Sequence, residues 1–439
     1  MLTDRQGHAM SGATTASAAR YDEAVAAFNL YRGDPLSPLD AAMAEAPEHA
    51  MAPIAKAMLM ALATEPAATA EAQKLYDMAR PLPMNERERS FMAALGLLLR
   101  GDWVKAATAM DLHNARWPRD LLALQAGHLM DFFRGNARDL RDRVARAMPA
   151  WPDDMPGQGV VRGMYAFGLE ECGDYARAED MGRAAIDAEP RDAWAHHAVA
   201  HVMEMQGRAA DGIGWMLARE PYWAEDDNFF KVHNWWHRAL CHLDLGQQQE
   251  ALALYDGPVR GQRSMVAVDM VDASALLWRM QLVGVDVGDR WEELADGWER
   301  HADGTLYPFN DWHAAMAYLG AGRASQMAGL RARLRLAAMG DNEVAAWAGK
   351  IAMPLIEGFA AFHRGEYETA ATVLHPLRFV AHQQGGSHAQ RDIIDWTMTE
   401  AAIRGGMREL ATSFANERVA LKAHSPLNRG FLQRAGALA

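Results

Sequence analysis

Six of the 17 histidines in this 439-residue chain lie between positions 196 and 242, and their spacing suits a shared site. His197 and His201 are four residues apart, as are His233 and His237, which places each pair on successive turns of one helix. Imidazoles in this arrangement can act as general bases, hydrogen-bond donors or ligands of one ion. The sequence requires no cofactor. If a divalent metal is bound, these four histidines are its expected ligands.

Two carboxylates follow these histidines. Glu204 lies three residues after His201, and Asp244 lies seven residues after His237. A carboxylate bound to one imidazole nitrogen fixes the tautomer and leaves the other nitrogen available for chemistry. We therefore treat His201 and His237 as candidate general bases, with Glu204 or Asp244 as the orienting group. A His-Glu-x-x-His metal motif is absent, as are serine-hydrolase, phosphate-loop and dinucleotide motifs.

Aromatic and basic side chains recur at the corresponding level further along the chain. The pattern Asn-x-Trp-His-x-Ala occurs at residues 234–239 and again at 310–315. Tryptophans can stack on a ligand, and arginines can hold its anionic group. The candidate ligand contacts are His197, His233, Trp236, Trp278, Arg279, Trp312, His313, His388 and Arg391. For any single histidine, the competing interpretation is a hydrogen-bonded packing partner.

A helical repeat is expected to position these residues. The triplet Gly-Asp-Tyr at 173–175 is followed by Ala178, Ala185 and Pro190. The glycine permits a tight turn between two helices, the alanines let those helices pack closely, and the proline ends the second helix. This pattern is typical of the second half of a tetratricopeptide (TPR) hairpin.

The same phase recurs along the chain. Gly101 and Gly135 are 34 residues apart, as are Gly173 and Gly207, and further turn glycines are expected at positions 246, 284, 322, 365 and 406. We predict an all-α, right-handed superhelical solenoid of about eleven TPR-like helix pairs. Residues 1–20 would form a flexible leader and residues 21–435 one continuous domain. The first helix of each pair should line a concave inner wall.

Composition narrows the range of partners and compartments. The net charge of −13 and the lack of a basic run argue against nucleic acid or an anionic membrane as the main partner. The first twenty residues contain no apolar export segment, and the longest apolar runs are too short to span a membrane. Only Cys172 and Cys241 are present, which excludes a disulfide framework and favours a cytoplasmic protein.

Several longer segments carry a resemblance to a known family. They are HAVAHVMEMQGR (197–208), HNWWHRALCHLDLG (233–246), DASALLWR (272–279), DWHAAMA (311–317), GGSHAQRD (385–392) and SPLNR (425–429). Across residues 20–435 the chain resembles the tetratricopeptide repeat protein 38 family, which includes StaR-like bacterial proteins. Cys241 and His196 are departures from its pattern. The resemblance implies a repeat fold throughout and no settled activity, and its motifs include the histidines at 197, 201, 233, 237, 313 and 388.

Two functions remain open at this point. We expect a TPR-like protein that binds a small molecule or peptide in a concave pocket lined by histidine and tryptophan. The alternative is an enzyme in the same pocket, in which His201 or His237 performs acid–base or metal-assisted chemistry such as hydrolysis. Arg279 or Arg391 would then hold a substrate anion. The terminal repeats leave homo-oligomerisation open, and the sequence does not identify the ligand or the reaction.

Overall fold

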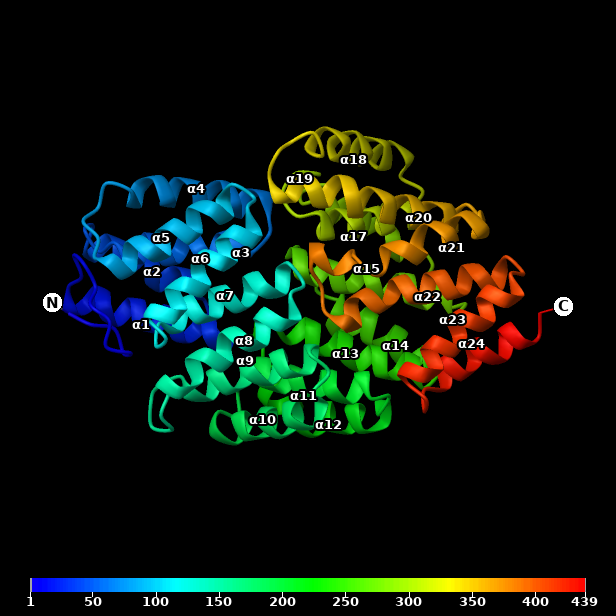
Figure 1. The fold of residues 1–439 in the computed structure, drawn as a ribbon, viewed down its shortest axis with the longest axis horizontal. Helices are drawn as coiled ribbons and strands as arrows, with labels where there is room; N and C mark the ends of the chain where they lie inside the picture. The colour runs from blue at the N-terminus through cyan, green and yellow to red at the C-terminus, as the bar shows by residue number, and fades with distance from the viewer. Residues whose placement is uncertain (1, 439) are drawn as a thin grey trace. The chain divides into compact units, whose positions relative to one another are not determined.

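The computed structural model describes residues 2–438, and within this range the chain is built from helices α1–α24 and four short helical turns (Figure 1). The described residues contain two isolated bridges and no strand. Consecutive helices form hairpins, so the predicted all-α architecture of TPR-like pairs is confirmed. The contacts divide the chain into two compact units.

The first unit comprises the residues up to Val199 together with Pro221–Lys231, and carries five helical hairpins. They are α1 (Thr15–Leu30) with α2 (Leu36–Glu45), α3 (Met51–Leu62) with α4 (Pro66–Ala79), α5 (Glu86–Leu99) with α6 (Trp103–Arg116), α7 (Leu121–Phe133) with α8 (Ala137–Ala147), and α9 (Gln158–Glu171) with α10 (Tyr175–Ala188). The short turn η1 (Met148–Ala150) follows α8.

The second unit comprises Ala200–Glu220 and the residues from Val232 onward. Its helices are α13 (Lys231–Asp244), α14 (Gln248–Leu254), α15 (Ala267–Leu282), α16 (Arg290–Trp298), α17 (Pro308–Gly320), α18 (Ala324–Ala337), α19 (Glu343–Trp347), α20 (Met353–His363), α21 (Tyr367–Leu377), α22 (His388–Arg404), α23 (Arg408–Leu421) and α24 (Pro426–Gly436), with turns η2 (Tyr255–Val259), η3 (Ala348–Ala352) and η4 (Ala381–Gln384). The boundary crosses α11 (Ala193–Met205) and α12 (Ala209–Trp223), and it also separates Lys231 from the rest of α13. The sequence predicts one continuous domain, whereas the contacts group the residues into these two units.

The turns between paired helices form where the repeat predicts them. The nine turn glycines have φ between 57° and 85°, a left-handed conformation that glycine adopts without strain; they are Gly101, Gly135, Gly173, Gly207, Gly246, Gly284, Gly322, Gly365 and Gly406. At the first of them, the N–H of Asp102 donates to the carbonyl of Leu97 at 3.1 Å and closes the end of α5. The alanines five residues after these glycines, among them Ala106 and Ala178, are fully buried, because the helices pack closely there.

The N-terminal segment is more ordered than the predicted leader. Helix α1 begins at Thr15, and Thr14 caps it by accepting a hydrogen bond from the Ser17 N–H at 3.2 Å. The N–H of Ser11 donates to Glu88 at 2.8 Å, and Met10 is buried. The sequence predicts a flexible leader up to residue 20; in the structure, the cap and these contacts hold residues 10–20 against the fold.

One helical stretch, Glu343–His363, is long and apolar enough to cross a membrane by length and composition alone. The side chains of this stretch are 67% buried inside the fold over the relevant window, and α20 packs on α17 and α21. Such burial is typical of a core helix in a water-soluble fold.

The first helices of successive hairpins pack directly on one another in the second unit. Helix α15 contacts α17 and α22, and α20 also contacts both α17 and α22. Trp278 of α15 and Trp312 of α17 both pack against Phe359 of α20, with ring centroids 4.9 and 5.2 Å apart. The predicted concave wall is a packed core at this level, because these large aromatic rings fill the space between the helices.

Candidate functional site

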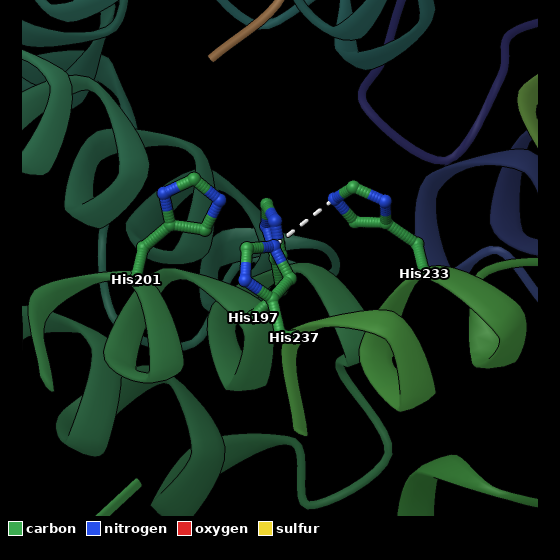
Figure 2. A group of neighbouring side chains, drawn as sticks. All are labelled: His197, His201, His233 and His237. Carbon is green, nitrogen blue, oxygen red and sulfur yellow. Dashed lines mark hydrogen bonds between the residues drawn. The ribbon is translucent and has the colours of Figure 1, made fainter. Parts of the chain in front are cut away.

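Four histidines from α11 and α13 form a buried cluster. His197 and His201 lie on successive turns of α11, and His233 and His237 lie on successive turns of α13. Each of these residues is at most 5% exposed. Figure 2 shows the four imidazoles grouped together, and one ring nitrogen from each lies within 4.8 Å of the others. The four-residue spacing gives each pair a common helix face, and the structure places the two pairs near each other.

Each histidine of α13 is bound by a carboxylate through Nδ1. His233 Nδ1 lies 2.8 Å from Asp272 Oδ2, and His237 Nδ1 lies 2.8 Å from Glu204 Oε2. The two rings also face each other, with their Nε2 atoms 3.1 Å apart (Figure 2). The result is a continuous polar chain from Asp272 through both imidazoles to Glu204.

Burial dominates the electrostatics of this chain. It lowers the pKa of His237 well below the usual range, and the positive forms of His201 and His233 lower it further. Burial raises the pKa of Asp272, although His233 opposes this effect. His237 is therefore neutral at pH 7, with a carboxylate at one nitrogen, which is the state required of a base or a ligand.

A small polar cavity lies beside this chain in the second unit. Its volume is about 20 Å³, the space that one water molecule needs. Its charged lining residues are Glu204, Asp244, Arg279, Asp392, Arg418 and Lys422, with Cys241 and Trp396 among the others. Side chains from α11, α13, α15, α22 and α23 therefore line one buried polar cavity.

Arg279 is the unusual cation at this cavity. Its guanidinium donates to the backbone carbonyls of Ala275, Ala389 and Gln390 at 3.3, 2.7 and 3.2 Å, and no carboxylate within the described residues 2–438 forms an ion pair with it. It also lies over the rings of Trp236 and Trp396, 5.4 and 5.7 Å from their centroids. Burial lowers its pKa to about 10, with Asp392 acting in the opposite direction.

The nearby acids are engaged elsewhere. Asp392 forms an ion pair with Arg418 at 2.8 Å, and Glu204 lies 3.8 Å from Lys422 while it binds His237. Asp244 accepts a hydrogen bond from Ser425, and burial raises its pKa. Glu204 is thus the carboxylate that contacts His237, and Asp244 binds a serine of the C-terminal segment instead.

Trp236 belongs to the site, whereas the other predicted aromatic contacts lie in the core. Its ring stacks on His233 at 5.2 Å with an interplanar angle of 16°. Trp278 donates through Nε1 to Thr397 at 3.0 Å, and Trp312 packs among Phe309 and Phe359.

His313 lies in the same aromatic core. Its Nδ1 lies 2.8 Å from the Phe309 carbonyl, and burial lowers its pKa to about 3. It is therefore a packing partner, although it shares the sequence pattern of His237. The match in motif does not produce a match in environment, because different helices cover the two positions.

His388 and Arg391 lie at the start of α22. His388 is exposed, unlike the four clustered histidines, and half-buried Arg391 donates to the Gly386 carbonyl. The residues that sequence reasoning missed are Asp272, Asp392, Arg418 and Lys422. Of these four residues, Asp272 is the one that helical spacing could have identified. It precedes Arg279 by seven residues and therefore lies on the same helix face.

No family model matches the chain. Among solved structures it is similar to the APC/C hetero-tetramer Cut9–Hcn1, at 14% identity and a TM-score of 0.45 over 95% of this chain and 76% of that chain. It is also similar to the human IFIT1 dimer with m7Gppp-AAAA, at 13% identity and a TM-score of 0.41 over 85% and 86% of the two chains. The hairpins and their glycine turns define the chain as a TPR-like helical-repeat protein.

Proposed function

We propose that this TPR-like protein binds a small molecule with an anionic group in the polar interior of its second unit. The observation that carries the proposal is Arg279, a fully buried guanidinium held by carbonyls and aromatic rings at the edge of a cavity. A buried charge without an opposite charge costs several kcal/mol, and a bound anion offsets that cost. A carboxylate is the simplest such anion, because its two oxygens match the guanidinium fork.

The charges around the cavity favour an anion. Arg418 is neutralised by Asp392, and Lys422 lies beside Glu204. Burial raises the pKa of Asp244, so this residue carries less negative charge than an exposed aspartate does. The Arg279 guanidinium therefore leaves the cavity with a net positive charge, and Trp396 supplies an aromatic wall for the rest of a ligand.

The size of the cavity sets a condition on binding. About 20 Å³ accommodates one water-sized group, so a larger ligand has to displace a neighbouring segment. Residues 418–425 of α23 and the following turn cover the site through Arg418, Lys422 and Ser425. We infer that this C-terminal segment moves aside when the ligand enters.

The test uses acetate, succinate and benzoate as probes, with sodium chloride of equal ionic strength as the control. We expect one or more of these carboxylates to raise the midpoint of thermal unfolding with concentration, because a ligand that binds only the folded state stabilises it. Arg279→Met should abolish that rise. Arg404→Met is the matched control, since Arg404 lies on α22 and binds Glu400 and the Leu282 carbonyl away from the cavity. No rise with any probe, or an equal rise in Arg279→Met, contradicts the proposal.

Enzymatic activity is the second candidate, favoured by the chain from Asp272 to Glu204. Two imidazoles with carboxylate partners are the parts needed for proton transfer. If the protein hydrolyses esters, turnover of p-nitrophenyl acetate should exceed that of buffer and fall at least tenfold in His237→Gln. Turnover equal to buffer, or unchanged in the variant, refutes this version.

The finer assignments from the sequence are also proposals. Membership of the tetratricopeptide repeat protein 38 family, peptide rather than small-molecule binding, and homo-oligomerisation each fit a helical-repeat fold. Both cysteines are free thiols, which accords with a cytoplasmic protein. Light scattering of the purified protein measures the oligomeric state directly.

A further inference from the structure

We propose that His197, His201, His233 and His237 bind one divalent transition-metal ion, zinc in preference to others, with Asp272 and Glu204 as the carboxylates that orient two of the ligands. This inference does not rest on the proposed anion site. It rests on the geometry of the four imidazoles and on the hydrogen bonds that join the two histidines of α13 to Asp272 and Glu204.

The distances match what an ion requires. Zinc binds imidazole nitrogen at about 2.0–2.1 Å, so two nitrogens in a tetrahedral site lie about 3.4 Å apart. The Nε2 atoms of His233 and His237 are already 3.1 Å apart. The four candidate ligand nitrogens all lie within 4.8 Å of one another. The four nitrogens are therefore close enough together to bind one ion.

The hydrogen bonds define a gap in the polar chain that a cation fills. The chain contains three contacts: Asp272 to His233, His233 to His237, and His237 to Glu204. Two neutral imidazoles carry two N–H groups, and both are used at Nδ1 when the carboxylates are ionised. The two Nε2 lone pairs then face each other at 3.1 Å, and a cation bound between them, either a proton or a metal ion, relieves their repulsion.

The surrounding carboxylates suit a metal centre. A histidine that binds zinc usually donates its other N–H to a carboxylate, which fixes the tautomer and raises the basicity of the ligating nitrogen. His233 and His237 both have that partner, from different helices, at 2.8 Å. Asp272 and Glu204 place two carboxyl groups beside the imidazoles in the protein interior, and a divalent cation there would stabilise their ionised forms.

The ligand set identifies the class of ion. Four imidazoles exclude hard cations such as Mg²⁺ and Ca²⁺, which prefer oxygen ligands. Imidazole suits zinc, copper and nickel, and tetrahedral geometry favours zinc. Four protein ligands and full burial describe a closed site. The ion would therefore hold α11 against α13 and position Glu204 at the edge of the neighbouring cavity.

The principal test is metal binding by the whole chain. Protein freed of metal by chelator is titrated with Co²⁺, and the visible absorption of tetrahedral cobalt is recorded; Zn²⁺ is then added in competition. We expect one equivalent of Co²⁺ per chain, an intense tetrahedral spectrum, and displacement by one equivalent of Zn²⁺. Binding below one tenth of an equivalent, or a weak octahedral spectrum, overturns the proposal.

Variants separate this site from adventitious binding. His233→Ala with His237→Ala should abolish the tetrahedral spectrum, and Asp272→Asn should weaken Co²⁺ binding by about 10- to 100-fold. His49→Gln, a buried histidine of the first unit, should bind as the unaltered protein does. An unchanged spectrum in the double variant overturns the proposal.

One further variant separates this inference from the proposed anion site. Arg279→Met should retain the full metal stoichiometry, because it removes a cation beside the cavity and none of the four ligands. The metal experiments contain no carboxylate probe. A failure of anion binding therefore leaves this inference intact, and a failure of metal binding leaves the anion site intact.

Discussion

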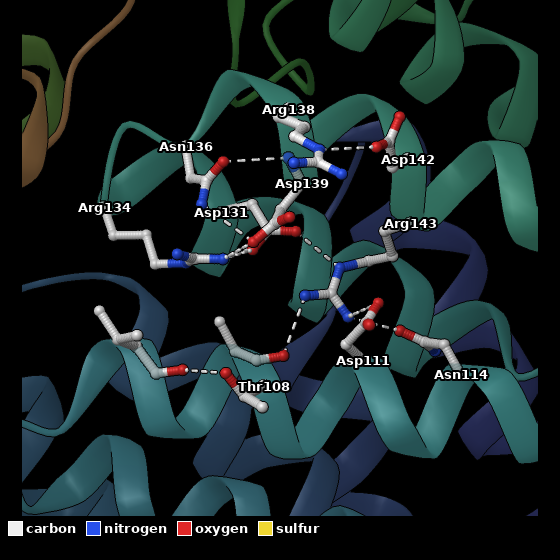
Figure 3. A network of polar contacts seen from close by, with 12 residues as sticks. Thr108, Asp111, Asn114, Asp131, Arg134, Asn136, Arg138, Asp139, Asp142 and Arg143 are labelled. Atoms are coloured by element: carbon white, nitrogen blue, oxygen red, sulfur yellow. Dashed lines mark hydrogen bonds and ion pairs between the residues drawn. The ribbon is translucent and has the colours of Figure 1, made fainter.

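Two buried arginines of this protein should respond in opposite ways to the same substitution. Arg143 in the first unit donates to Asp131 at 2.7 Å, to Asn114 at 3.0 Å and to the Ala107 carbonyl at 3.0 Å (Figure 3). Arg279 in the second unit is equally buried but binds only carbonyls. Methionine matches the length of the arginine stem, so replacing each arginine by methionine mainly removes its charge and its N–H donors.

The expected magnitudes follow from these environments. Arg143→Met leaves the buried Asp131 carboxylate with Arg134 alone, and breaking a buried ion pair costs about 3–5 kcal/mol of unfolding free energy. Burial lowers the pKa of Arg279 to about 10, and each pKa unit corresponds to about 1.4 kcal/mol, so its charge costs the folded state about 3 kcal/mol. The lost hydrogen bonds to carbonyls offset about 2 kcal/mol of the gain. Arg279→Met should therefore change the unfolding free energy by only about 1 kcal/mol, in the stabilising direction.

Urea unfolding followed by circular dichroism measures both variants. We expect the unfolding free energies of the two variants to differ by about 4 kcal/mol or more. Arg279→Met should be at least as stable as the unaltered protein. If Arg279→Met loses as much stability as Arg143→Met, the guanidinium of Arg279 is a structural element. That result would exclude the proposed anion site.

Three further predictions concern the packing and ionisation of buried groups. Gly127→Ala should destabilise the fold by about 1–3 kcal/mol in urea unfolding, because its Cβ would lie 2.8 Å from the Arg143 guanidinium. Gly430→Ala is the control: its added Cβ would have no atom within 4 Å, so this substitution should be neutral or stabilising. Burial raises the pKa of Asp192 from 3.8 to about 7, so the folded state holds this proton more tightly than the unfolded state. The unfolding free energy should therefore fall as the pH rises from about 4 to about 7. Asp192→Asn should flatten that decline, and an unchanged pH profile would refute the assignment. Burial also raises the pKa of the Cys241 thiol, so Ellman's reagent should label it only at the rate of unfolding.

The repeat architecture could be predicted because its determinants are local. A left-handed glycine at each turn, such as Gly101, and a small residue five positions later, such as Ala106, act within one hairpin. The pairing of His197 with His201 on one helix face follows from helical periodicity in the same way. The leader boundary was less predictable, because the buried position of Met10 depends on contacts with later helices.

The composition of the candidate site was decided by tertiary structure. His233 meets Asp272 across 39 residues, and Arg279 meets the Ala389 carbonyl across 110. No periodicity along the chain encodes these contacts, since the first joins α13 to α15 and the second depends on how α22 packs against α15. His237 and His313 occupy the same motif, yet one faces a carboxylate and the other a backbone carbonyl. Sequence alone determined which helices form and which faces carry the imidazoles; only the packing between helices determined which carboxylates and cations meet them.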